Sequence, residues 1–314
     1  MGAASPSQSP ASGQVEKNRV ALTSVGAAVL LTGMKVTVGL STGSLGILSE
    51  AAHSGIDLLA AVMTWWAVRA SAKPPDDDHL YGHGKIENFS ALFETGLLLA
   101  TCVWIAYEAV RRLLLGTGHV EATPWAFGVM AISIVVDVSR SRALARVARA
   151  HRSQALEADA LHFSTDVWSS TVVLLGLVGV WLADYTGVGW LARADAVAAL
   201  GVAAVAALVS VRLGRKSVED LLDTAPVGLL ERIARAALVP EVASVSQVRV
   251  RRSGPRTFAD VILQVPRGVP VERAHEIAHA AEDAIRGAVQ DVDVMVHTEP
   301  DEAPGSVGAP AGVA

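Results

Sequence analysis

Residues 49–57 read Ser-Glu-Ala-Ala-His-Ser-Gly-Ile-Asp, and residues 160–166 read Ala-Leu-His-Phe-Ser-Thr-Asp. Each stretch places a histidine four residues before an aspartate: His53 before Asp57, and His162 before Asp166. Because residues four apart share one face of a helix, each pair presents an imidazole and a carboxylate to the same point. Two such faces that meet would supply two nitrogens and two oxygens, a complete tetrahedral set for a zinc-like divalent ion. The two stretches therefore predict one metal site built from two helices.

Both stretches lie inside long apolar runs. The 314-residue chain is 51% hydrophobic and 18% charged, with a mean hydropathy of +0.40, which is more apolar than soluble proteins usually are. Helices of sufficient length to cross about 30 Å of hydrocarbon are predicted at six places: residues 19–41, 45–69, 88–114, 125–147, 161–184 and 194–213. Ionisable side chains at membrane depth usually line a cavity or an ion path. The metal site is therefore expected inside the membrane.

The short basic segments predict the orientation of this membrane domain, which spans residues 18–216. Positive charge gathers before the first run, between the fourth and fifth, and after the sixth, at Lys17, Arg19, Arg146, Arg149, Arg152, Arg212, Arg215 and Lys216. Such segments stay in the cytosol, so both termini are expected there. Residues 1–17 predict a disordered tail rather than a signal peptide, and residues 301–314 a second tail. The Ala, Val, Arg and Gly content, with few Lys, favours a bacterial cytoplasmic membrane.

Residues 217–300 have the pattern of a small cytosolic α+β domain. Helices are predicted at 228–238 and 271–287, and strands at 245–252, 258–265 and 292–297. The order αββαβ favours a ferredoxin-like arrangement, with an antiparallel sheet and both helices on one face.

A second polar cluster lies between the second and third runs, where residues 74–85 read Pro-Pro-Asp-Asp-Asp-His-Leu-Tyr-Gly-His-Gly-Lys. Its carboxylates and imidazoles, with glycines that allow tight turns, could coordinate a divalent cation at the cytosolic mouth. A solvated, charged loop explains the same composition. The residues alone leave the two interpretations open.

Several classes of function are disfavoured. The net charge of −5 is spread along the chain and indicates no nucleic-acid partner. The single cysteine, Cys102, excludes an intramolecular disulfide and a metal site built on cysteines. An intramembrane metallohydrolase would need a general base such as the glutamate of His-Glu-x-x-His, and none of the six apolar runs contains that motif. We therefore expect no enzyme, and a membrane metal sensor without transport is the remaining alternative to a transporter.

Taken together, the six runs, residues 49–57, 81–85 and 160–166, and the αββαβ domain resemble the cation diffusion facilitator family of metal-ion/proton antiporters. The resemblance covers nearly the whole chain. It implies a homodimer that exports Zn²⁺, or in some members Cd²⁺, Fe²⁺, Co²⁺ or Mn²⁺, from the cytosol. It also implies a transport site at His53, Asp57, His162 and Asp166, a loop site at Asp76, His79 and His83, and a structural salt bridge between Lys85 and Asp223.

Zinc is the expected substrate. Imidazole suits borderline ions such as Zn²⁺, whereas sites made only of oxygen suit harder ions such as Mn²⁺. Manganese carriers of the family usually have a carboxylate at the position of His162. Co²⁺, Cd²⁺ and Fe²⁺ accept similar ligands and stay open as substrates.

The cytosolic domain departs from the family pattern, because Ser246 and Ile262 stand where some members have histidines. We expect a weaker metal site shared between subunits, which would hold Zn²⁺ as a regulatory ion through Asp260, His275, His297 and Glu299. Metal and protons compete for imidazole and carboxylate groups, so the transport site predicts metal efflux coupled to H⁺ entry by alternating access.

Overall fold

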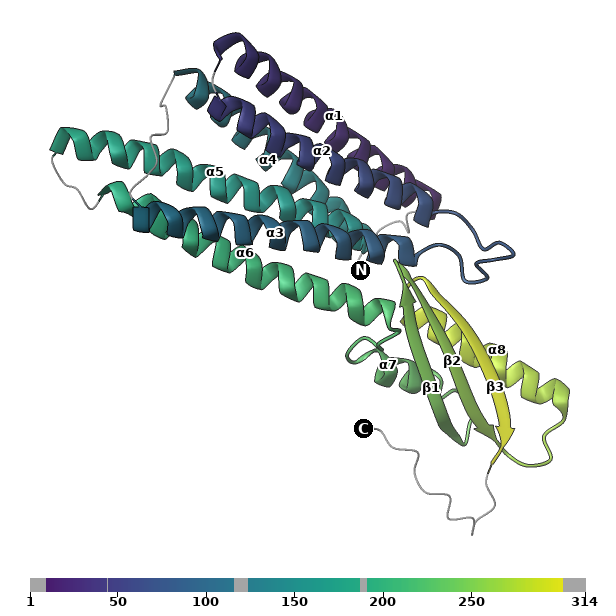
Figure 1. Cartoon of the computed structure of the whole chain (residues 1–314). Helices are drawn as coiled ribbons and strands as arrows, with labels where there is room; N and C mark the ends of the chain where they lie inside the picture. The colour runs from purple at the N-terminus through teal and green to yellow at the C-terminus, as the bar shows by residue number, and fades with distance from the viewer. Residues whose placement is uncertain (1–9, 44, 116–123, 187–190, 302–314) are drawn as a thin grey trace, which may run out of the picture. The chain divides into compact units, whose positions relative to one another are not determined.

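A computed structural model describes residues 10–43, 45–115, 124–186 and 191–301 (Figure 1). The chain divides into two compact units between Val218 and Glu219, whereas the sequence places the division after residue 216. The first unit is made of six long helices: α1 (Pro10–Thr42), α2 (Leu45–Ser71), α3 (Lys85–Leu115), α4 (Pro124–His151), α5 (Gln154–Thr186) and α6 (Leu191–Leu221), whose last turn runs past the division. The second contains α7 (Leu229–Ala236), β1 (Ser244–Ser253), β2 (Arg256–Val265), α8 (Val271–Ala288) and β3 (Val292–Pro300).

Helix α1 begins earlier than the sequence predicts. Residues 10–17 are helical, although the predicted disordered tail extends to residue 17. Contacts with other helices explain the difference, because the Gln14 amide donates to the carbonyl oxygen of Val68 at 2.8 Å and the Lys17 ammonium donates to Glu87 at 2.7 Å. The amino-acid composition of this segment reflects only its local conformational preference and contains no information about such contacts. Residues 1–9 and 302–314 of the predicted tails lie outside the described residues.

Six membrane-spanning helices are not confirmed by length and apolarity alone. Among the described residues, two segments pass that test, Ser12–Thr42 and Lys85–Arg111.

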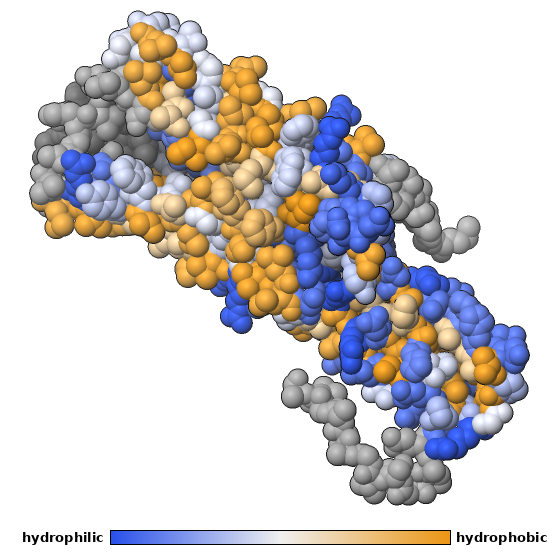
Figure 2. All heavy atoms as spheres, turned by 45° about the vertical axis from the view of Figure 1, so that its right-hand side comes forward, coloured by the Kyte–Doolittle hydropathy of each residue, from blue (hydrophilic) through white to orange (hydrophobic). Residues whose placement is uncertain are grey.

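The side chains of the helical unit are distributed as in a bundle surrounded by lipid. Many buried positions are small or polar, such as Ala21, Ala61 and Thr64, whereas large apolar side chains such as Leu30 and Trp104 point outward and are 71% and 66% exposed. Figure 2 shows such apolar residues spread over the outer surface of this unit. Small residues at helix contacts and apolar residues facing out are typical of membrane bundles, because lipid chains solvate large apolar groups.

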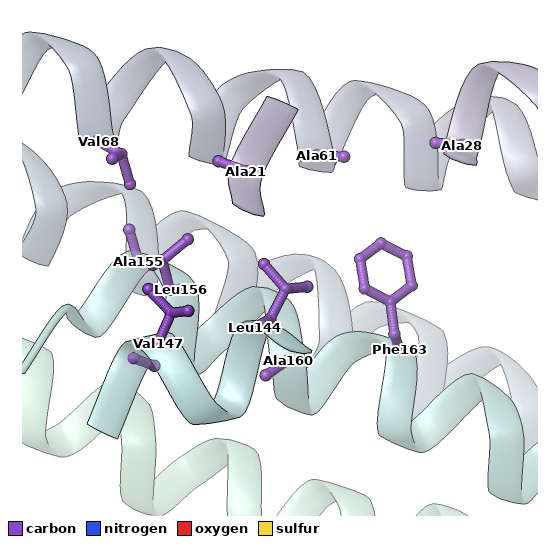
Figure 3. Packing of buried hydrophobic residues seen from close by; sticks show 11 residues of the cluster. Ala21, Ala28, Ala61, Val68, Leu144, Val147, Ala155, Leu156, Ala160 and Phe163 are labelled. Carbon is purple, nitrogen blue, oxygen red and sulfur yellow. The ribbon is translucent and has the colours of Figure 1, made fainter. Parts of the chain in front are cut away.

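An apolar cluster joins α1, α2, α4 and α5 (Figure 3). Its members are Ala21, Ala28, Ala61, Val68, Leu144, Val147, Ala148, Ala155, Leu156, Ala160 and Phe163. Phe163 is 1% exposed, and the Arg140 guanidinium lies 3.5 Å from the centre of its ring. Because Phe163 follows His162 directly, this packing fixes the turn of α5 that carries the predicted ligand.

In the second unit the elements follow in the predicted order and form one sheet, β1-β2-β3. Strands β1 and β2 are antiparallel, but β2 and β3 are parallel, so the expectation of an antiparallel sheet is wrong for this pair. The reason is that α8 connects β2 to β3 and returns the chain to the end where β2 began. Both helices pack on one face, where Ile233 of α7 and Ile285 of α8 meet Val261 and Leu263 of β2.

Candidate metal sites

Helices α2 and α5 bring the two His-x-x-x-Asp pairs together. Nε2 of His162 lies 3.1 Å from Oδ1 of Asp57 and 3.5 Å from Oδ2 of Asp166. Nε2 of His53 lies 3.9 Å from Oδ1 of Asp57 and 4.0 Å from Oδ1 of Asp166. Ligand atoms of His53, Asp57 and Asp166 lie within 4.8 Å of one another, and His162 contacts both carboxylates of this group.

These separations match the size of a tetrahedral zinc site. Ligand atoms about 2.0–2.1 Å from a tetrahedral ion lie about 3.3 Å from one another. The four His–Asp separations range from 3.1 to 4.0 Å, and the longest ones involve His53. The group of ligand atoms that lie close enough to share one ion does not include His162.

The environment of the site also favours a bound cation. Asp57, His162 and Asp166 are buried, whereas the side chain of His53 is 39% exposed. Oδ2 of Asp166 is buried and accepts no hydrogen bond from the residues that the structure describes. Because a buried carboxylate oxygen without a partner costs free energy, a positive ligand would stabilise this site.

Lys35 lies close to this site on α1. Its ammonium donates to the Ser54 hydroxyl at 2.7 Å and to the Glu50 carboxylate at 3.3 Å. A lysine within an apolar run can either form an ion pair inside the bundle or extend its side chain toward the membrane surface. Lys35 forms an ion pair, with Glu50. Ser54 follows His53, so this contact also restrains the α2 turn that bears the imidazole.

The loop between α2 and α3 assembles the second predicted site. Nδ1 of His79 lies 3.1 Å from one oxygen of Asp76, and Nε2 of His83 lies 3.4 Å from the other. The two imidazole rings are 4.3 Å apart between centroids. Asp76 and His79 are exposed and His83 is partly buried. One carboxylate and two imidazoles therefore face one another, and solvent or another molecule would supply any further ligand.

The backbone of this loop holds the three groups in place. Gly82 has a φ of 75°, and its N–H donates to the His79 carbonyl at 2.8 Å. This left-handed turn, which favours glycine, returns the chain so that His83 lies beside His79. Desolvation acts to raise the pKa of Asp76, but hydrogen bonds from the backbone and ring of His79 and the charge of both imidazoles lower it below the usual value. Asp76 therefore stays ionised and ready to bind a cation.

The four residues of the predicted metal site in the cytosolic domain do not lie close together within a single chain. Asp260 is exposed on β2, and His297 and Glu299 lie on β3 with 3.8 Å between Nε2 and Oε1. His275 lies on α8, where its Nε2 is 3.1 Å from Nε2 of His279. No group of three or more possible ligands forms among the described residues of this unit. A site completed by a second subunit stays a prediction.

The predicted salt bridge between Lys85 and Asp223 would join the two units. Lys85 begins α3, and Asp223 follows α6, where its carboxylate lies 3.8 Å from the Arg251 guanidinium of the same unit. The bridge stays a prediction.

Two buried acids near the transport site have no part in the predicted sites. Glu94 of α3 and Asp159 of α5 are 2% and 0% exposed. Glu94 is visible in the sequence as a polar residue in an apolar run, but Asp159 is missed. Asp159 lies one helical turn before His162, and this position in the sequence could have indicated that it lies near the site.

Comparison with known proteins gives the family. The model of the cation efflux transmembrane domain matches residues 21–222, and that of the cation efflux protein cytoplasmic domain matches residues 229–301. The chain belongs to the cation efflux family, the cation diffusion facilitators. It is therefore a membrane-embedded protein of metal efflux with a cytoplasmic C-terminal domain, in a family of transporters rather than enzymes.

Curated relatives from several Salmonella strains support this cation efflux assignment. The cation-efflux pump FieF of Salmonella schwarzengrund (strain CVM19633) and that of Salmonella agona (strain SL483) are each 30% identical over 288 residues, which cover 91% of this chain and 93% of each pump. Among solved structures, a cadmium form and a nickel form of MamM CTD variants are 33% and 34% identical. Each covers 24% of this chain, and 98% and 96% of the MamM chains, with TM-scores of 0.24 and 0.23.

Proposed function

We propose that this protein exports Zn²⁺ from the cytosol in exchange for H⁺, and that His53, Asp57, His162 and Asp166 bind the metal during transport. The observation that carries the proposal is that each of the two imidazoles lies 3.1–4.0 Å from both carboxylates between α2 and α5. Two nitrogens and two oxygens at this spacing suit tetrahedral zinc.

The contact between His162 and Asp57 supports the proposed proton coupling. The His162 Nε2–H donates to Asp57 at 3.1 Å, so a proton stands where the metal must bind. Zinc requires the imidazole nitrogen without its proton and the carboxylate without a proton, so each metal that binds displaces protons. Protons that arrive from the other side of the membrane would displace the metal in turn.

Transport requires that this site open to each side of the membrane alternately. We place six membrane spans in the first unit, with both termini in the cytosol, and we place the protein in a bacterial cytoplasmic membrane. The outward-facing apolar side chains of the bundle support an environment of lipid.

The second unit acts in this proposal as a dimerisation and regulatory domain. The family model that matches it is named ZT_dimer, which favours a homodimer. We propose that the Lys85–Asp223 salt bridge ties the membrane part to the cytosolic dimer. Asp76, His79 and His83 would bind metal at the cytosolic mouth, and Asp260, His275, His297 and Glu299 would form a weaker regulatory site between subunits.

Zinc is proposed over harder ions because half of the ligands are imidazoles. Co²⁺, Cd²⁺ and Fe²⁺ accept the same ligands and are the alternative main substrates. A metal sensor without transport would use the same site, and only a measurement of flux separates it from a transporter.

The test is metal-driven proton movement in proteoliposomes that contain a pH-sensitive dye. Zn²⁺, Co²⁺, Cd²⁺ and Mn²⁺ are compared for the native protein, for Asp57→Ala, and for Glu157→Gln, whose exposed carboxylate on α5 pairs with Lys216. We expect proton movement with Zn²⁺ that is lost in Asp57→Ala and kept in Glu157→Gln. Zinc binding without flux in the native protein would overturn the transport proposal in favour of a sensor, and faster flux of Mn²⁺ would overturn the selectivity.

A further inference from the structure

Two carboxyl groups of the helical unit are fully buried and face each other. Glu94 of α3 is 2% exposed and Asp159 of α5 is 0% exposed. Their side chains lie within hydrogen-bonding reach of each other, although the residues come from helices far apart in sequence. Two ionised carboxylates cannot share such a position, because both repulsion and burial oppose the second charge.

The hydrogen bonds around this carboxyl pair leave one oxygen of each carboxyl group without a donor. The Thr64 hydroxyl donates to Oε1 of Glu94 at 2.9 Å, and the Ser24 hydroxyl donates to Oδ2 of Asp159 at 3.3 Å. The other oxygens, Oε2 of Glu94 and Oδ1 of Asp159, are buried and receive no donor from any residue in the described ranges. One proton between the two carboxyl groups would satisfy both oxygens at once.

The charged groups around the pair cannot neutralise two negative charges. On α4 the nearest cation is Arg140, which donates to the Ser24 hydroxyl at 3.1 Å and is held by Asp137 at 3.1 Å. Ser24 on α1 and Thr64 on α2 are neutral, and on α5 the titratable group that faces Asp159 is His162. The surroundings therefore support one negative charge on the pair and a proton in place of the second.

Glu87, two turns before Glu94 on α3, is a buried acid of the same bundle that is paired with a cation. It is 0% exposed, and the Lys17 ammonium lies 2.7 Å from it, with further donation from the Ser71 and Ser153 hydroxyls. Glu94 has a hydroxyl and a second acid in place of such a cation. This contrast points to a neutral proton donor at Glu94 or Asp159.

We propose that Glu94 and Asp159 form a proton-binding site separate from the metal ligands, which holds one proton while the metal site is empty and releases it when the metal binds. Asp159 lies one helical turn before His162, on the same face of α5. In the proposed exchange a divalent cation takes the place of the proton between His162 and Asp57, and it brings positive charge one helical turn from Asp159. Nearby positive charge favours the ionised form of a carboxyl group, so the shared proton passes to solvent.

The inference rests on the proposed exchange of metal for H⁺. It adds one proton to the number released for each metal ion that binds. The test is isothermal calorimetry of Zn²⁺ binding to the purified full-length protein, in buffers with different ionisation enthalpies, which gives the protons released per metal. In Glu94→Gln the side chain keeps its shape and the acceptor for Thr64, and its amide N–H replaces the shared proton permanently. We expect this variant to release about one proton fewer per metal than the native protein.

The matched control is Glu157→Gln, which removes an exposed carboxylate from α5 and should release as many protons as the native protein. Metal bound at the loop contributes equally to all three proteins, so the difference isolates the pair. An unchanged proton count in Glu94→Gln would overturn the proton site. A lower count in Glu94→Gln together with no zinc flux in the native protein would support the proton site while the transport proposal failed.

Infrared spectroscopy tests the proposal independently of Glu94→Gln, should that variant fail to fold. At neutral pH the metal-free native protein should show the C=O stretch of a protonated carboxyl group, and this band should vanish when Zn²⁺ is added. Asp159→Asn should lack the band in both states. Absence of the band from the metal-free native protein would overturn the proposal.

Discussion

Nε2 of His162 on α5 lies 3.1 Å from Oδ1 of Asp57 on α2. The contact joins residues that are 105 positions apart in the sequence. It places an imidazole from one His-x-x-x-Asp stretch against a carboxylate from the other, so the site exists only while α2 and α5 stay packed together. A movement that separates the two helices would open the site, as alternating access requires.

Replacement of His162 by aspartate should change the preferred metal. His162→Asp removes one of the two imidazoles and leaves three carboxylates, which suit harder ions such as Mn²⁺. We expect the ratio of Zn²⁺ to Mn²⁺ transport in proteoliposomes to fall by roughly tenfold or more. His279→Asp changes an exposed histidine of α8 and should keep the native ratio. Equal ratios in the two variants would show that the imidazole of His162 has no part in selectivity.

The buried ion pair between Lys17 and Glu87 should be essential for stability. Lys17→Met leaves the Glu87 carboxylate buried without its cation, which should cost about 3–5 kcal/mol and lower the thermal unfolding midpoint. The double variant Lys17→Met with Glu87→Gln should recover much of the loss, because no uncompensated charge remains. Lys216→Met breaks an exposed pair with Glu157 and is the control. A midpoint for Lys17→Met equal to that of the control would contradict the prediction.

Metal binding at the loop site should depend on Asp76. Asp76→Asn should weaken metal binding at the loop by at least about tenfold, the range seen when even supporting groups of a metal site are lost. Because the pKa of Asp76 is below its usual value, the carboxylate stays charged as pH falls. Mild acid should therefore leave the contribution of Asp76 to metal binding intact.

Calorimetric titration with Zn²⁺ at several pH values measures this effect at the loop. Asp77→Asn is the matched control, since Asp77 is the next residue and lies outside the ligand cluster. Similar loop affinities in the two variants would rule out a metal-binding role for Asp76.

The core of the cytosolic domain should tolerate little loss of volume. Ile285 of α8 is 0% exposed and packs with Leu263 of the sheet, so Ile285→Ala should destabilise this unit by about 2–5 kcal/mol. Amide hydrogen exchange in β1 and β2 of the full-length protein should become faster. Val271→Ala, at an 82% exposed position of the same helix, should leave the exchange unchanged. Native exchange rates in Ile285→Ala would show that the helix and sheet do not unfold together.

Helix periodicity accounts for what could be read directly from the residues. The His-x-x-x-Asp spacing predicts two ligands on one helix face, because residues four apart are neighbours in any helix. Alternation of apolar residues likewise predicts the αββαβ order of the second unit, which the structure contains. These features depend on local geometry, so the sequence contains them without knowledge of the fold.

Contacts between distant segments needed the tertiary structure. The helical state of residues 10–17 depends on partners in α2 and α3, and the parallel pairing of β2 with β3 depends on the path of α8. The meeting of Glu94 with Asp159 depends on how α3 packs against α5. The residues alone predicted the long helices, the candidate ligands on them and the family, because periodicity and motif are local properties. Only the tertiary structure decided which buried charges meet, because that choice is made by packing between helices.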